Sequence, residues 1–169
     1  MALIKSVRGN TPRFGNNCFL ADNATVVGEV VMGDNCTVWF NAVVRGDVHS
    51  ITIGNNTNIQ DGAIIHCTYQ KAKTVIGNNV SIAHNAIVHG CTIHDDVLVG
   101  MGAIIMDDAV IGSNSVIAAG AVVLPGTQVE PGSTYAGMPA KRIKDTSEEM
   151  KAVIQRTAKN YPMYAEWFK

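Results

Sequence analysis

The amino-acid sequence places an aliphatic or aromatic residue at every sixth position over most of its length. The series is Phe14, Leu20, Val26, Met32, Val38, Val44, Ile53, Ile59, Ile65, Ile76, Ile82, Val88, Ile93, Val99, Ile105, Ile111, Ile117, Val123 and Val129. Three steps break the interval: three residues are added after Val44, five are added after Ile65, and one is missing after Val88. A fixed six-residue period is typical of a solenoid that folds as a β-helix.

The ordinary secondary structures do not fit this spacing. An amphipathic helix needs apolar residues about every 3.6 positions, and an ordinary strand alternates over a short run before a turn. Here Gly and Asn follow the apolar residue repeatedly, as in Gly54-Asn55-Asn56 and Gly77-Asn78-Asn79. These residue types tolerate positive φ and form tight corners. The sequence therefore predicts an all-β solenoid of triangular coils, each of about eighteen residues.

The 169 residues are enough for one such core, and the chain divides into two predicted parts. We expect residues 1–140 to form the β-helix domain and residues 141–169 to form a C-terminal helical segment that packs on its outside. Thr146 or Ser147 is the expected N-cap of the helix, and Pro162 is expected to end or kink it. Lys141, Arg142 and Lys144 are interpreted as a solvated start to this helix, in preference to a phosphate-binding cluster.

Charge and composition exclude several classes of partner and location. The net charge of −1 gives no reason to expect nucleic acid or an anionic membrane as a partner. The sequence lacks a long apolar run and begins without the apolar region of a secretory signal, so we expect a cytoplasmic protein. Cys18 and Cys36 recur at one place in successive coils and are expected to pack. Cys67 and Cys91 lie near histidines, which leaves a ligand or redox role open, although the sequence has no CxxC pair.

Three histidines occupy fixed places on the repeat. His66 follows Ile65 and His89 follows Val88, so the two imidazoles should be stacked neighbours on one face, with Arg45 beneath them. Neighbouring parallel strands lie about 4.8 Å apart. His84 falls on the preceding face, above Asp61. Three neutral imidazoles around an ion with one open position are the usual ligands of catalytic zinc, and the sequence predicts such a site.

A second column of residues indicates where that site lies. Each of its members directly precedes an inward-facing residue and must therefore point outward: Val43, Ile64, Ile87, Ile104 and Val122. A contiguous apolar stripe on a surface usually marks an interface. The paired histidines project on the same side as the stripe, so we expect the metal at a subunit boundary. A closed three-fold assembly would let His84 reach the pair of a neighbouring subunit.

Three segments carry a specific family resemblance. They are Val44-Arg45-Gly46-Asp47, then Asn58-Ile59-Gln60-Asp61-Gly62 with His66, and His84-Asn85-Ala86-Ile87-Val88-His89-Gly90-Cys91. These blocks resemble the signature motifs of γ-class carbonic anhydrases, and the similarity extends from about Arg13 to the end of the chain. The resemblance implies a left-handed parallel β-helix of the hexapeptide-repeat superfamily.

The same resemblance implies an activity and a set of site residues. The activity is the reversible hydration of CO2 to bicarbonate by a metal-bound hydroxide, in a homotrimeric lyase. His66 and His89 of one subunit and His84 of the next would bind Zn2+, although Fe2+ and Co2+ also accept imidazole ligands. Gln60 would hydrogen-bond the hydroxide or the bicarbonate. The resemblance further implies that Asn58 helps to position the substrate. It implies a charged network between subunits, formed by Arg45, Asp47 and Asp61, and an approach to the site by Tyr164 of the helix.

One departure from the family pattern keeps other functions open. Val48 stands where a glutamate follows the aspartate in the best-characterised members, and the insert 67–74 contains no acidic residue, so the usual proton carrier is absent. Hexapeptide folds also host acyltransferases and acyl-CoA thioesterases, which bind coenzyme A between subunits and need one histidine as general base. A latent, non-catalytic trimeric scaffold is the third alternative.

Overall fold

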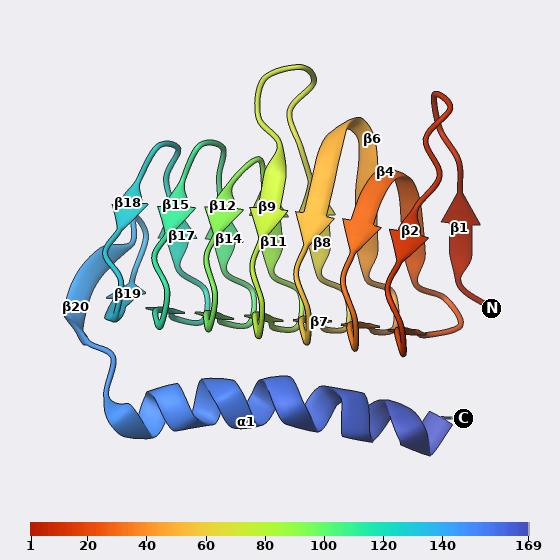
Figure 1. Ribbon diagram of the computed structural model, residues 1–169. Helices are drawn as coiled ribbons and strands as arrows, with labels where there is room; N and C mark the ends of the chain where they lie inside the picture. The colour runs from red at the N-terminus through yellow and green to blue at the C-terminus, as the bar shows by residue number, and fades with distance from the viewer. Residues whose placement is uncertain (169) are drawn as a thin grey trace.

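The repeat winds into a left-handed parallel β-helix of about seven turns, with one long helix lying along its side (Figure 1). This is a computed structural model, and it describes residues 1–168. Figure 1 shows successive coils side by side, in sequence order along the axis. The predicted fold class is confirmed. In the described range, no helix is both long and apolar enough to cross a membrane.

Two sheets form the walls of the β-helix. The sheet beside the helix contains eight strands: β3 (Phe19–Leu20), β5 (Thr37–Val38), β7 (Asn58–Ile59), β10 (Ser81–Ile82), β13 (Leu98–Val99), β16 (Val116–Ile117), β19 (Ser133–Ala136) and β20 (Lys141–Asp145). The other contains twelve and makes the two remaining faces: β1 (Leu3–Lys5), β2 (Arg13–Phe14), β4 (Thr25–Met32), β6 (Val43–Ile53), β8 (Ile64–His66), β9 (Thr74–Ile76), β11 (Ile87–His89), β12 (Thr92–Ile93), β14 (Ile104–Ile105), β15 (Val110–Ile111), β17 (Val122–Val123) and β18 (Gln128–Val129).

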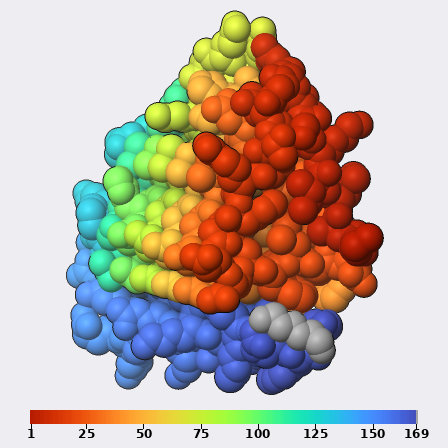
Figure 2. All heavy atoms as spheres, turned by 45° about the vertical axis from the view of Figure 1, so that its right-hand side comes forward, coloured from red at the N-terminus to blue at the C-terminus, as the bar shows by residue number. Residues whose placement is uncertain are grey.

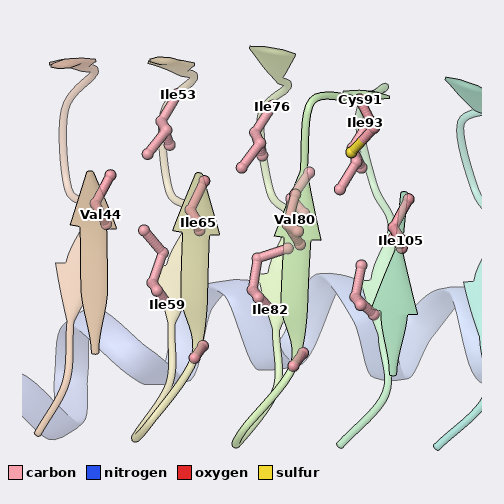
Figure 3. Close-up of a cluster of buried hydrophobic side chains, with 14 of the residues drawn as sticks. Val44, Ile53, Ile59, Ile65, Ile76, Val80, Ile82, Cys91, Ile93 and Ile105 are labelled. Atoms are coloured by element: carbon pink, nitrogen blue, oxygen red, sulfur yellow. The ribbon is translucent and has the colours of Figure 1, made fainter. Parts of the chain in front are cut away.

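The six-residue series fills the interior, as predicted. From Val26 to Val129 every member of the series is buried, and only the first two, Phe14 and Leu20, are partly exposed. Figure 3 shows how Ile59, Ile65 and Ile82 point into the space between the walls. Isoleucine and valine suit this position because their branched side chains pack well on a pleated surface.

Truncation of one of these side chains should lower the stability of the whole β-helix. Ile82 is fully buried, so Ile82→Ala is expected to reduce the free energy of unfolding by about 2–5 kcal/mol, through lost burial and the cavity left behind. Chemical denaturation at one protein concentration measures the change. Ile4→Ala is the matched control, because Ile4 is 47% exposed and its truncation should cost far less. Equal losses in the two variants would contradict this account of the core.

Two of the three interruptions of the repeat lie in β6 and in a projecting loop, and the third, the missing residue after Val88, lies between β11 and β12. The three residues added after Val44 extend β6, which pairs with β8 on one face and with β9 on the next. The five added after Ile65 form the tall loop between β8 and β9 in Figure 1. At one edge this loop meets the N-terminal hairpin, where the Arg8 guanidinium lies 5.5 Å from the Tyr69 ring centre (Figure 2).

Asparagine ladders hold the coils together at one corner. Asn35, Asn56 and Asn79 all have φ between 53° and 55°, a conformation that asparagine tolerates better than most residues. The Asn35 amide donates to Asn56 at 3.3 Å, and the Asn56 amide donates to Asn79 at 3.1 Å. These asparagines therefore adopt the positive φ that the corner requires, and their side chains also link one coil to the next.

The two N-terminal cysteines take part in the same corner. Cys18 is half-buried and Cys36 is buried. Each thiol donates to a backbone carbonyl of the next coil: Cys18 to Gly33 at 3.1 Å and Cys36 to Gly54 at 3.0 Å. Thr57 makes the equivalent bond with its hydroxyl. The predicted packing position of both cysteines is confirmed, and all four cysteines are free thiols.

The C-terminal segment differs from its prediction at its start. Lys141–Asp145 does not begin the helix; it forms β20, which runs antiparallel to β19 and is exposed throughout. Helix α1 spans Glu148–Ala165, with Ser147 as N-cap, and is followed by the 3-10 turn η1 (Glu166–Phe168). The helix does not end at Pro162 but continues through it. The division of the chain at residue 140 stays a proposal.

Candidate metal centre

His66 and His89 are stacked neighbours on one face of the β-helix. They are the last residues of β8 and β11, and the parallel register pairs them directly. The two ring centres are 5.1 Å apart, and His66 Nδ1 lies 3.1 Å from His89 Nε2. The repeat alone predicted this pairing, and the structure confirms it.

The second ring nitrogen of each histidine is within hydrogen-bonding distance of a carboxylate. His66 Nε2 lies 3.1 Å from Asp47 Oδ1, and Asp47 Oδ2 in turn accepts from the Arg45 guanidinium at 2.5 Å. His89 Nδ1 lies 2.5 Å from Asp107 Oδ1. Arg45 and Asp47 were expected near the site, and the structure places both there.

Asp107 was missed by the sequence analysis. It follows β14 one coil beyond His89, and its second oxygen accepts from the Thr68 hydroxyl at 2.5 Å. Gly90 lies next to His89 in the preceding coil, and a side chain at Gly90 would collide with the Asp107 carboxylate. The glycine is consistent with the contact, but the clash itself can be seen only in the structure.

The paired imidazoles suit a tetrahedral ion. Zinc binds histidine nitrogen at about 2.0–2.1 Å, so two nitrogens on one tetrahedral ion are about 3.3 Å apart. The 3.1 Å between His66 Nδ1 and His89 Nε2 is close to that value. Metal-binding histidines also usually hold their other nitrogen on a carboxylate, as both do here. The donor set and its surroundings fit a divalent metal of this class.

The protonation states favour the same ligand role. Burial, followed by the nearby Arg45 charge, lowers the pKa of His66, although the hydrogen bond with Asp47 opposes the shift. Burial would raise the pKa of Asp47, but hydrogen bonds from Arg45 and His66 hold it below its ordinary value. Burial acts the same way on Asp107, and hydrogen bonds from Thr68 and His89 lower its pKa. Near neutrality His66 is therefore a neutral imidazole beside ionised carboxylates, which is the form that binds metal.

His84 lies apart from this pair in the single chain. It follows β10 on the neighbouring face, and its Nδ1 lies 3.0 Å from Asp61 Oδ2, as the repeat predicted for these two residues. On the same face, the buried Gln60 amide donates to Asn58 at 2.9 Å, and the Asn58 amide donates to Ser81 at 2.8 Å. One chain therefore presents two groups of site residues on adjoining faces. Across residues 1–168, no three histidine, cysteine or acidic side chains come together as a cation site.

The outward stripe runs past the histidine pair in perfect register. The strand pairing aligns its five members, Val43, Ile64, Ile87, Ile104 and Val122, across β6, β8, β11, β14 and β17. All five retain exposed surface in the single chain, and Ile64 is 41% exposed. A hollow of about 440 Å³ adjoins the stripe and is lined by Ile87, His89, Ile104 and Asp107, among others. The apolar surface and the candidate ligands are therefore one continuous region.

The two cysteines near the histidines are not suited to bind metal. Burial raises the pKa of Cys91 to about 12, and burial also raises that of Cys67. A cysteine binds metal as the thiolate, and both residues are held as thiols inside the β-helix.

The helix carries two neighbouring tyrosines, Tyr161 and Tyr164. Tyr164 accepts a hydrogen bond from the Asn160 amide at 3.2 Å and packs on Tyr161. Burial raises the pKa of Tyr161 to about 12, and the Asp61 charge adds to the shift. Tyr164, the tyrosine that the sequence analysis selected, is thus held by contacts within the helix, and its part at the site stays a prediction.

Comparisons with known proteins agree with this geometry. A family model described as bacterial transferase hexapeptide (six repeats) matches residues 11–46 and 90–125. A probable carbonic anhydrase of Methanocaldococcus jannaschii is 43% identical, over 89% of this chain and 94% of its own. The mitochondrial gamma carbonic anhydrase 2 of Arabidopsis thaliana is 36% identical, over 94% of this chain and 59% of its own.

A solved structure matches almost the entire chain. The crystal structure of a putative acetyltransferase from Bacillus cereus superposes with a TM-score of 0.95 at 33% identity, over 99% of this chain and 96% of that one. The same fold thus occurs in a protein described as an acetyltransferase, whereas the relatives above are named carbonic anhydrases. The extended sequence identity with carbonic anhydrases shows, however, that this chain belongs to the γ-class carbonic anhydrase family of hexapeptide-repeat proteins.

Proposed function

We propose that the protein catalyses the reversible hydration of CO2 to bicarbonate at a metal held by His66, His89 and the His84 of a neighbouring subunit. The observation that carries this proposal is the paired imidazoles, 3.1 Å apart and each backed by a carboxylate. Family membership adds support, because relatives of similar length are named carbonic anhydrases.

The proposed metal is Zn2+, and Fe2+ or Co2+ would be held by the same imidazoles. When bound, such an ion acts as a Lewis acid that makes hydroxide available near neutral pH, an effect for which carbonic anhydrase is the standard example. The protein's own part is to orient both imidazoles, and burial also keeps His66 neutral. Asp47 orients His66, and Arg45 holds Asp47 in place.

The proposed roles of the remaining residues follow their contacts. Gln60 donates to Asn58 and so has a fixed orientation, which suits a group that hydrogen-bonds bicarbonate. Asn58 orients Gln60, and Asp61 orients His84. A part for Tyr164 in the reaction stays a proposal that rests on the family resemblance alone. The insert supplies no acid, so proton transfer to buffer is the expected route for releasing the proton.

The proposed assembly is a homotrimer whose contact surface is the outward stripe. A closed three-fold arrangement brings the histidine pair of each subunit to a boundary where another subunit's His84 can complete the ligand set. Apolar residues in register over five strands are the kind of surface that oligomers bury. A cytoplasmic location stays a prediction from the sequence.

Acyl transfer is the second candidate function. It is favoured by the close superposition with the Bacillus cereus protein described as a putative acetyltransferase. Such an enzyme needs one basic histidine and a coenzyme A site, whereas this chain pairs two histidines and backs each with a carboxylate. The pairing favours carbonic anhydrase activity over acyl transfer.

Metal removal tests the proposed function directly. Protein stripped with a chelator and then reloaded anaerobically with Zn2+ or Fe2+ should regain CO2 hydration in stopped-flow measurements, whereas the stripped protein should show only the buffer rate. Reloading with Mg2+, which prefers oxygen ligands, is the matched control and should restore nothing. A fully loaded trimer without activity would contradict the proposal. Tight coenzyme A binding by that trimer would favour the second candidate.

A further inference from the structure

Asp107, like Asp47, is an acidic side chain beside the histidine pair with a partner for each of its oxygens. Both of its oxygens have partners, since Oδ1 lies 2.5 Å from His89 Nδ1 and Oδ2 accepts from the Thr68 hydroxyl at 2.5 Å. It sits in the coil after His89, so its position depends on how two coils stack. Its side chain is 20% exposed, which partly shields these hydrogen bonds from water.

This contact determines which nitrogen of His89 is free. An ionised carboxylate only accepts hydrogen bonds, so Nδ1 must carry the proton that is shared with Asp107. The lone pair is then on Nε2, the nitrogen that lies 3.1 Å from His66. In the opposite tautomer, His89 Nε2 would carry the proton and point its N–H toward His66, so this nitrogen could not bind a metal.

The backbone keeps Asp107 at this place. The Gly126 amide donates to the Asp107 carbonyl at 2.9 Å, and the next amide, of Asp108, donates to Gly90 at 2.8 Å. Gly90 has a φ of 55° and no side chain, which leaves room for the carboxylate. Any larger residue at Gly90 would occupy the position of Asp107 Oδ1.

The insert between β8 and β9 completes the arrangement. Its backbone closes on itself where the Thr68 amide donates to Ala72 at 3.1 Å, and this turn points the Thr68 hydroxyl at Asp107. At the base of the insert, the buried Thr74 hydroxyl donates to the His66 carbonyl at 2.7 Å and accepts from the Gly90 amide at 3.0 Å. The five added residues thus join both histidine strands to the carboxylate.

We infer that Asp107, clamped by Thr68 of the insert, is a positioning residue that fixes His89 so that Nε2 faces the metal. The inference rests on the proposed metal site. It also gives the insert a role: this loop contains no acid of its own but holds one from another coil. Asp107 therefore acts on His89 as Asp47 acts on His66.

Zinc affinity and tautomer state together test this role. Asp107→Ala should weaken Zn2+ binding by about 10- to 100-fold in competition with a chromogenic chelator, the usual effect of losing such a partner. Thr68→Val should weaken it less, because the carboxylate remains. Asp108→Asn is the matched control: Asp108 is an exposed neighbour with a φ of 60°, which asparagine also tolerates, and its affinity should equal that of the wild type.

A second measurement separates positioning from general damage. Long-range ¹H–¹⁵N correlations of the zinc-free protein should show His89 protonated at Nδ1 in the wild type and in Asp108→Asn, but mixed between nitrogens in Asp107→Ala. The inference would be overturned if Asp107→Ala kept the wild-type zinc affinity while a separate His89→Ala trimer no longer bound zinc. That result would leave the proposed function intact. A wild-type trimer that takes up no zinc would overturn both.

Discussion

Two inactive variants of this protein should restore activity to each other when they assemble together. Homotrimers of His84→Ala and of His89→Ala are each expected to lose zinc and CO2 hydration, because every site lacks one of its three imidazoles. When the two chains are co-expressed with different affinity tags and both tags are used for purification, the mixed trimers should bind zinc and hydrate CO2.

The size of the recovery follows from three-fold symmetry. In any mixed trimer only one boundary pairs an intact His66 and His89 with an intact His84, so one site in three is complete. Random assembly from equal amounts makes about three trimers in four mixed, and about one quarter of all sites is then functional. Purification on both tags removes the two homotrimers, so the mixed trimers should hold about one zinc ion each, and their stopped-flow rate should be about one third of the wild-type rate. Mixed trimers without zinc would show that the three ligands come from a single chain.

A single charge in the outward stripe should separate the subunits. Ile87 lies at the centre of the stripe, paired with Ile64 on one side and Ile104 on the other. Ile87→Asp places an unpaired carboxylate in each of the three proposed boundaries, and burying such a charge costs far more than an apolar contact contributes. Sedimentation velocity should therefore change from trimer to monomer at micromolar concentration, and zinc affinity should fall with it.

Ile143→Asp is the control for this prediction. Ile143 lies in β20, away from the stripe, and is 59% exposed. The substitution adds the same charge and should leave the trimer intact. Circular dichroism must show that the Ile87→Asp monomer keeps its β-helix, since Ile87 points away from the core. A trimer of wild-type mass in Ile87→Asp would mean that the subunits meet at another surface.

The sequence predicted the parts of the fold that depend on local repetition. Each inward residue, such as Ile65 or Ile82, needs only its own corner and its own coil to be placed correctly. The same rule predicts from the sequence alone that His66 lies beside His89 and that His84 lies above Asp61, as the structure confirms. A column in a β-helix can be read from residue numbers, because the strand register is fixed by the period.

The parts that were missed depend on contacts outside the repeat. Asp107 reaches His89 only because the insert supplies Thr68 and because Gly90 leaves space, and no fixed interval connects these residues. The added residues after Val44 could equally have formed a loop, and they became strand because β4 and β9 pair with them. Lys141–Asp145 has no apolar alternation, and its strand is formed by antiparallel pairing with β19.

Strand β20 also has a consequence for how the protein behaves in concentrated solution. Stacked parallel coils leave a row of unpaired backbone groups at each end, and such edges can recruit another molecule and grow into fibres. Here the last strand at the C-terminal end reverses direction and carries Lys141, Arg142, Lys144 and Asp145 on a fully exposed edge. An incoming coil would meet a strand of the wrong polarity and a row of solvated charges. On the face beside the helix, β20 thus gives the stack an edge that disfavours aggregation.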